Sequence, residues 1–185
     1  AGGVETLIDL TKRLPAHLPA AICIVIHLAS TAPSVLPQIL SRVGEIPAIH
    51  PKDGEIIRQG QIYVCPPDYH LEVSRGHLHL SHGPIENGYR PAIDVLFRTA
   101  AESYGPRVIG IVLSGMLSDG TLGLQLIQEA GGLTIVQDPE NALFPKARMV
   151  GVDLTGANLG GATLTEAVLD DAHLAKAELA GADLS

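Results

Sequence analysis

The sequence predicts a three-layer, doubly wound α/β domain with a mostly parallel sheet and inserted antiparallel hairpins, followed by a short segment of another architecture. Three observations predict this. Apolar runs alternate with one-sided helical patterns over the first 150 residues, brief extended runs stand between turn residues, and the periodicity changes at Gly151. Alternating strands and helices build a parallel sheet covered on both faces. With 185 residues and 46% hydrophobic side chains, the chain can bury the core of one such domain.

The first elements follow the strand, loop and helix order of a βαβ unit. Apolar residues at helical spacing after two glycines predict the first helix: Val4, Leu7, Ile8 and Leu14. A continuous apolar run at 21–26 predicts a buried strand that ends at His27, and a further short strand is expected at 46–49. We interpret this order as part of a βαβ unit.

The middle of the chain predicts antiparallel hairpins inserted into the layered domain. Brief extended runs stand at 62–64, 71–73 and 78–80, separated by Pro66-Pro67 and by Arg75-Gly76. Later segments return to the layered pattern. We expect a helix at 93–104 with Pro91 in its first turn, a strand at 108–113, a helix at 122–130 closed by Gly131-Gly132, and a strand at 133–136.

Past Gly151 a leucine recurs every five residues, which is neither a strand nor a helix period. The leucines are Leu154, Leu159, Leu164, Leu169, Leu174, Leu179 and Leu184. A small apolar residue precedes each of them by two positions. The pattern resembles the pentapeptide-repeat family, whose units stack as a four-sided, right-handed β-helix with leucines at the centre. We therefore expect an α/β domain at 1–148 and a pentapeptide-repeat segment at 149–185. A helix is the alternative, although a period of five rotates each leucine off one helical face.

Composition excludes several functional classes. The net charge is -8 and no basic run stands out, so we expect no nucleic-acid partner. The apolar run at 20–28 is too short to cross a membrane, so no membrane insertion is expected. Cys23 and Cys65 lack a CxxC partner and predict buried free thiols in a reducing compartment, hence a cytoplasmic protein. The chain has no initiator Met and opens on Ala1-Gly2-Gly3 as though inside a motif, so we expect a fragment.

A histidine and an aspartate follow two buried strands. His27 ends the strand at 21–26, and Asp119-Gly120 closes the loop after the strand at 108–113. Carboxyl ends of parallel strands share one sheet edge, so we expect these side chains to approach hydrogen-bond distance. Such a pair provides the base and the orienting acid of a serine hydrolase. The alternative is a packed histidine and a helix N-cap aspartate.

Taken together, the motifs of residues 1 to about 148 resemble the CheB-type methylesterase domain in order and spacing. They are Ala1-Gly2-Gly3 with Val4-Glu5, Ile26-His27-Leu28, Asn87-Gly88-Tyr89-Arg90-Pro91 with Asp94 and Phe97, Leu113-Ser114-Gly115-Met116 with Asp119-Gly120, and Val136-Gln137-Asp138-Pro139-Glu140. In that family a G-x-S-x-G-G turn carries the nucleophile. The resemblance implies a serine immediately before Ala1, with His27 as general base and Asp119 as its orienting acid.

The resemblance also implies further site residues. The amide of Ala1 and the loop at Met116 would stabilise the oxyanion, and Tyr89 and Arg90 would position the substrate. Arg90 could instead pair with an acid at the helix start. No metal or organic cofactor is implied.

The implied function is hydrolysis of glutamate methyl esters on chemoreceptor helices in bacterial chemotaxis, with deamidation of glutamine as a second acyl transfer. Many relatives carry a response-regulator receiver domain upstream, and such a domain is a candidate partner. Without the serine, we expect the 185-residue chain to be essentially inactive. The rival interpretation is an interaction protein built on a degraded esterase fold plus repeats.

Two other groups could suggest chemistry. Ser30, Thr31 and Ser34 follow His27 but lack a glycine-bracketed turn, which favours a loop and a helix N-cap. His77, His79 and His82 could suggest a metal, but strand alternation places the first two on one solvent face without a matching carboxylate or cysteine.

Overall fold

The computed structural model describes residues 2–27, 34–113 and 119–136. The predicted repeat segment at 149–185, together with Ala1, Ser30, Thr31 and Met116, lies outside the described residues. The chain divides into two compact units, and the candidate site lies in the first, Ala1–Gly110 with Ser118–Ile135.

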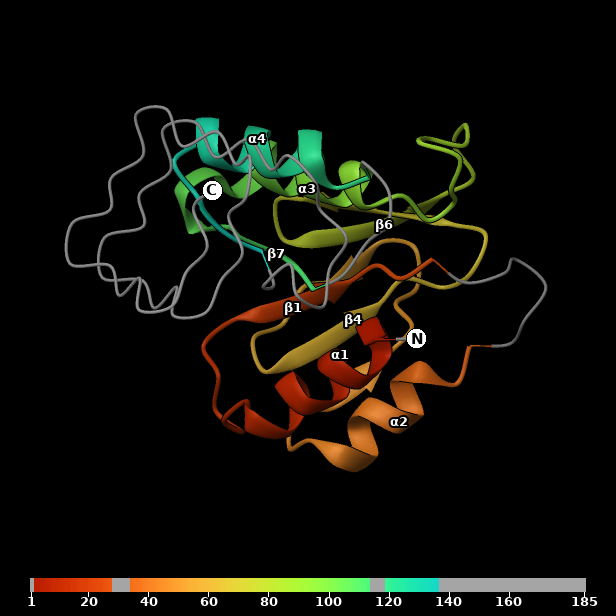
Figure 1. The fold of residues 1–185 in the computed structure, drawn as a ribbon, viewed down its shortest axis with the longest axis vertical. Helices are drawn as coiled ribbons and strands as arrows, with labels where there is room; N and C mark the ends of the chain where they lie inside the picture. The colour runs from red at the N-terminus through yellow and green to blue at the C-terminus, as the bar shows by residue number, and fades with distance from the viewer. Residues whose placement is uncertain (1, 28–33, 114–118, 137–185) are drawn as a thin grey trace, which may run out of the picture. The chain divides into compact units, whose positions relative to one another are not determined.

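A parallel sheet lies at the centre of the first unit (Figure 1). Its strands are β1 (Ala21–Ile24), β4 (Gln61–Val64) and β2 (Ala48–Ile49), in the order β1-β4-β2. β4 pairs in parallel with both neighbours. The predicted α/β class with a parallel sheet is confirmed.

The assignment of residues 62–64 to an inserted hairpin was wrong. They form β4, the middle strand of the parallel sheet. Ile62, Tyr63 and Val64 are all completely buried, on both faces of the strand. A middle strand covered on both faces requires this, whereas a hairpin exposes one face to water.

The helices cover opposite sides of the parallel sheet (Figure 1). On one side lie α1 (Gly2–Arg13) and α2 (Leu36–Val43), which bury Leu7 and Leu40. On the other side lie α3 (Ile93–Tyr104) and α4 (Thr121–Glu129). Val35, not a hydroxyl residue, is the N-cap of α2, so the N-cap interpretation of Ser34 was wrong.

The predicted antiparallel insertion is confirmed for two of its three runs. β5 (His70–Ser74) and β6 (His77–Ser81) form a hairpin, and β3 (Glu55–Ile56) adds to β6 as an unpredicted edge. The backbone of Gly76 turns this hairpin with a φ of 85°, which favours glycine.

The remaining elements follow the predicted order with small shifts at their ends. Ala92 is the N-cap of α3, so Pro91 precedes the helix rather than standing in its first turn. A short 3₁₀ turn, η1 (Gly105–Arg107), leads to β7 (Ile109–Val112), which forms a two-stranded sheet with β8 (Leu133–Val136).

Both cysteines are free; Cys65 is buried and Cys23 is partly buried. Burial raises the pKa of each thiol to about 12, so neither is a reactive nucleophile. Among the described residues, no helix is both long and apolar enough to cross a membrane.

Candidate active site

His27 and Asp119 are in direct contact, as their positions after two strands predict. His27 lies three residues beyond β1, and Asp119 lies two residues before α4. The imidazole Nε2 is 2.8 Å from Asp119 Oδ2. The aspartate side chain is 1% exposed and the histidine side chain 27% exposed. The carboxylate is therefore enclosed, while part of the imidazole remains accessible.

Four donors surround the Asp119 carboxylate. Oδ1 accepts hydrogen bonds from Asn87 Nδ2 at 2.9 Å and from the Asp94 amide at 3.1 Å. Oδ2 accepts one from the Ile93 amide at 2.7 Å in addition to the contact with His27. The two amides belong to the first turn of α3. Asp119 therefore caps the first turn of α3 with its side chain. It is not the N-cap residue of α4, the helix that follows it in sequence, because that position is Gly120.

These donors keep Asp119 ionised. Burial raises the pKa of the carboxyl, but hydrogen bonds from His27, Ile93, Asn87 and Asp94 outweigh it and lower the pKa to about 2. An ionised carboxylate only accepts hydrogen bonds, so the neutral imidazole must carry its hydrogen on Nε2. The lone pair of the neutral ring then lies on Nδ1. Nδ1 is the nitrogen that can accept a proton from a substrate or a nucleophile.

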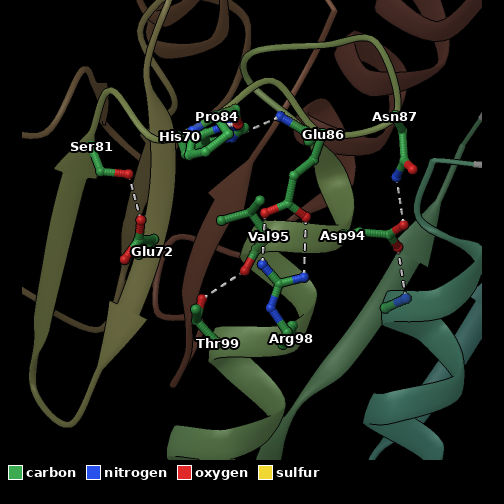
Figure 2. Close-up of polar contacts among 12 residues, drawn as sticks. His70, Glu72, Ser81, Pro84, Glu86, Asn87, Asp94, Val95, Arg98 and Thr99 are labelled. Carbon is green, nitrogen blue, oxygen red and sulfur yellow. Dashed lines mark hydrogen bonds and ion pairs between the residues drawn. The ribbon is translucent and has the colours of Figure 1, made fainter.

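Asp94 makes the reciprocal cap. Its Oδ1 accepts hydrogen bonds from the Gly120 amide at 3.0 Å and the Gly123 amide at 2.7 Å, both at the start of α4. Its Oδ2 accepts one from Asn87 at 2.7 Å. Figure 2 shows the Asp94 carboxylate between Asn87 and the first turn of α4. Each of the two helices thus receives its N-terminal cap from an aspartate at the start of the other.

Tyr89 and Arg90 occupy different environments. The Tyr89 ring stacks on the His27 ring, with centroids 3.7 Å apart and planes inclined by 5°. Arg90 donates from Nε and Nη2 to Asp68 Oδ1, at 3.0 and 2.7 Å, and from Nη1 to the Gly83 carbonyl at 2.9 Å. These contacts hold the pKa of Asp68 below its usual range. Arg90 therefore pairs with an acid in the 66–69 loop and not with one at the helix start, as the alternative supposed.

The other candidates do not join this site. The Ser34 carbonyl lies 3.3 Å from Nε2 of His50. His79 lies beside Asp53, and His82 beside Asp68. Within the described ranges, no group of three His, Cys, Asp or Glu residues has the geometry of a metal site. The predicted oxyanion residues, Ala1 and Met116, are not among the described residues.

The sequence interpretation missed the role of Asn87. Its side chain joins the two aspartates, although it stands seven residues before Asp94 and 32 before Asp119. The available signal was the Asn-Gly pair, which favours a tight turn that folds the chain back on itself.

A histidine held by a buried, ionised aspartate in an α/β fold is similar to the histidine–aspartate pair of serine hydrolases. The CheB methylesterase family model matches residues 1–150, and the pentapeptide-repeat model matches eight copies at 140–185. The chain belongs to the CheB methylesterase family, with pentapeptide repeats following.

Individual relatives agree with this assignment. A putative protein-glutamate methylesterase/protein-glutamine glutaminase of Leptospira interrogans is 38% identical over 151 residues, covering 80% of this chain and 78% of the relative. A protein-glutamate methylesterase/protein-glutamine glutaminase of Methanosarcina mazei is 37% identical over 150 residues, covering 77% of this chain but 41% of the relative. The crystal structure of the Thermotoga maritima CheB methylesterase catalytic domain matches with a TM-score of 0.72 and 32% identity, over 77% of each chain.

Proposed function

We propose that this domain supplies the catalytic base and orienting acid of a protein-glutamate methylesterase that also deamidates glutamine. The contact between His27 and the ionised Asp119 carries the proposal, because it leaves Nδ1 of a half-enclosed imidazole ready to accept a proton. The names of the relatives support the two reactions. The proposal keeps a seryl nucleophile immediately before Ala1.

In the proposed mechanism both reactions are acyl transfers. Nδ1 of His27 takes the hydroxyl proton while the serine Oγ bonds to the carbonyl carbon, and the carbonyl electron pair moves onto oxygen. The tetrahedral intermediate then expels methoxide or amide, which takes the proton from Nδ1. Water repeats the steps, releases glutamate and restores the serine. Asp119 stays ionised throughout and stabilises the imidazolium.

The proposed oxyanion donors are the Ala1 amide and the loop at Met116, and the proposed substrate contacts are Tyr89 and Arg90. The proposed substrate is a methylated glutamate on a chemoreceptor helix in the cytoplasm, with a response-regulator receiver domain upstream as a candidate regulator. The chemistry requires proton transfer and an oxyanion site, which the polypeptide can supply without a metal or an organic cofactor.

Methanol release from a methylated receptor fragment tests the proposal. The assay uses the chain extended upstream along its own gene. His27→Ala should lower kcat by roughly 10⁴- to 10⁶-fold and Asp119→Asn by roughly 10⁴-fold. His79→Ala and Asp53→Asn are matched controls. They alter a second histidine–aspartate pair, which is exposed, has its histidine on β6, and should be dispensable for activity.

Two outcomes would contradict the proposal. If the extended chain is folded but inactive, the interaction-protein interpretation is favoured. Full activity of the 185-residue chain would place the nucleophile inside it, with Ser30 the serine nearest to His27 in sequence.

A further inference from the structure

A four-residue turn, Glu86–Tyr89, lies against the candidate site. Its two central residues, Asn87 and Gly88, have φ of 53° and 83°. Glu86 and Tyr89 exchange both backbone hydrogen bonds, at 3.2 and 2.9 Å. Positive φ at both central positions is the requirement of a type I′ turn, and Asn-Gly is the pair that adopts it most readily. The local sequence therefore sets the shape of this turn.

Three side chains of the turn contact three different parts of the site. Glu86 pairs with Arg98 of α3 through both carboxylate oxygens, at 2.9 and 3.2 Å (Figure 2). Asn87 contacts both buried aspartates, and Tyr89 stacks on His27. The Glu86 pair fastens the turn to α3, and the other two side chains reach the groups that would perform the chemistry.

The Asn87 amide has two hydrogens, and each goes to a different carboxylate. One lies on Asp94 at 2.7 Å and the other on Asp119 at 2.9 Å. Rotation of a carboxylate about its last side-chain bond is only weakly restricted by intrinsic preference. Together with the backbone amides of Ile93 and Asp94, the Asn87 amide holds the Asp119 carboxylate so that Oδ2 faces Nε2 of His27. Asn87 supplies the side-chain part of this grip.

Tyr89 restricts the other partner. Its ring is stacked nearly parallel to the imidazole with centroids 3.7 Å apart, so it covers one face of the imidazole and restricts the plane of that ring. With the plane fixed and Nε2 held by Asp119, the direction of Nδ1 is determined.

We propose that the Glu86–Tyr89 turn is a positioning device for the candidate base, in which Asn87 orients the Asp119 carboxylate and Tyr89 orients the His27 ring. The consequence for catalysis rests on the proposed function, whereas the consequence for the geometry of His27 does not. Asn87 and Tyr89 are positioning residues, since each acts through the imidazole and its partner.

Imidazole NMR signals of the 185-residue chain test the geometry directly. At a pH where the ring is neutral, wild-type His27 should show the single Nε2–H tautomer, with its ring protons shifted upfield by Tyr89. Asn87→Gly keeps the left-handed backbone but removes the amide, and should give mixed tautomers and faster exchange of the Nε2 proton. The His27→Gln spectrum identifies the signals among the eight histidines.

Tyr89 is tested with a matched pair. Tyr89→Leu should abolish the upfield shift of the His27 ring protons, while Tyr89→Phe keeps the stacked ring and should leave the shift in place. Neither site is in the buried core, so these variants should fold. Unchanged His27 signals in both Asn87→Gly and Tyr89→Leu would overturn the proposal.

Activity of the upstream-extended chain separates the positioning role of the Glu86–Tyr89 turn from the proposed function. Asn87→Gly and Tyr89→Leu should each lower kcat roughly 10- to 100-fold with KM little changed, and Tyr89→Phe should restore it. A raised KM at unchanged kcat in Tyr89→Leu would show that Tyr89 serves substrate binding without orienting His27, and would overturn its positioning role. If the wild-type extended chain is inactive while the NMR signals respond as expected, the proposed function fails and the positioning role stands.

Discussion

Asp119 shows how one buried charge can serve both the fold and the candidate site. Its carboxylate caps the first turn of α3 and also holds the imidazole of His27. Both tasks require the ionised form, because backbone amides and Nε2–H are all donors. The donors that stabilise the helix thus set the charge state that the proposed mechanism needs.

Acid should destabilise the domain through this residue. The folded pKa of Asp119 is about 2, below the ordinary value of 3.8. A depressed folded pKa stabilises the folded state above the unfolded pKa, and that contribution is lost as pH falls from about 4 toward 2. It amounts to about 2 kcal/mol at neutral pH.

Urea unfolding at several pH values checks this. Asp119→Asn should have a lower free energy of unfolding at pH 7 and a smaller loss between pH 4 and pH 2 than the wild type. Asp9→Asn, at an exposed carboxyl on α1, is the control. An identical acid dependence in wild type and Asp119→Asn would show that Asp119 is not the titrating group.

The contact of His27 with Asp119 can be predicted from sequence because each residue follows a recognisable apolar strand run. The two runs form strands of different sheets, β1 and β7, and β7 leaves Ile109 and Ile111 exposed, so the shared parallel-sheet edge that motivated the prediction is not observed in the described part of the chain. The contacts of Asn87 and Arg90 cannot be predicted this way. They depend on how a turn folds back and which of several acids it meets, and Arg90 meets Asp68 rather than an acid of α3. Apolar periodicity carries no information on such pairings.

At the scale of elements, α3 and α4 approach each other closely at Gly123. A Cβ there would collide with Cβ of Phe97 and come within 3.0 Å of Asp94 Oδ1. Phe97 is a core residue and Asp94 is the cap of α4, so neither neighbour can give way easily. The lack of a side chain at this position is what allows the reciprocal capping of the two helices.

Gly123→Ala should therefore destabilise the domain by about 1–3 kcal/mol, although alanine is the better helix former by about 1 kcal/mol. Thermal and urea unfolding measure the change. Gln125→Ala, two residues later on the exposed side of α4, should change stability by less than about 0.5 kcal/mol. A stabilised Gly123→Ala variant would mean that the helices are not in contact there.

The hairpin assigned to 62–64 shows where element prediction fails. An apolar run of three or four residues fits a middle parallel strand or a hairpin strand equally well, and only its partners decide. Here the partners are β1 and β2, whose paired residues lie 40 and 14 positions earlier in the chain. Local pattern determines that a strand forms, and long-range pairing determines its sheet.

At the scale of the whole molecule, two sequence patterns divide the chain. The α/β domain is matched by one family model, and the five-residue period beyond Gly151 is matched by another. We propose the boundary at residues 148–149, within the stretch that both models cover. The β-helix itself stays a prediction, which rests on the period and on the family match.

Circular dichroism of the whole chain, with the spectrum of residues 1–148 subtracted, tests the repeat segment. A right-handed coil with leucines inside should contribute a β-type difference spectrum, because its backbone is extended along each side. Leu169→Asp should remove that contribution, since it would bury an unpaired carboxylate among the other leucines. Asp170→Asn, at the next position, which the pattern directs outward, should leave it unchanged. A helix-dominated difference spectrum would contradict the β-helix and favour the helical alternative, in which a period of five scatters the leucines around the helix and an aspartate at 169 would be tolerated.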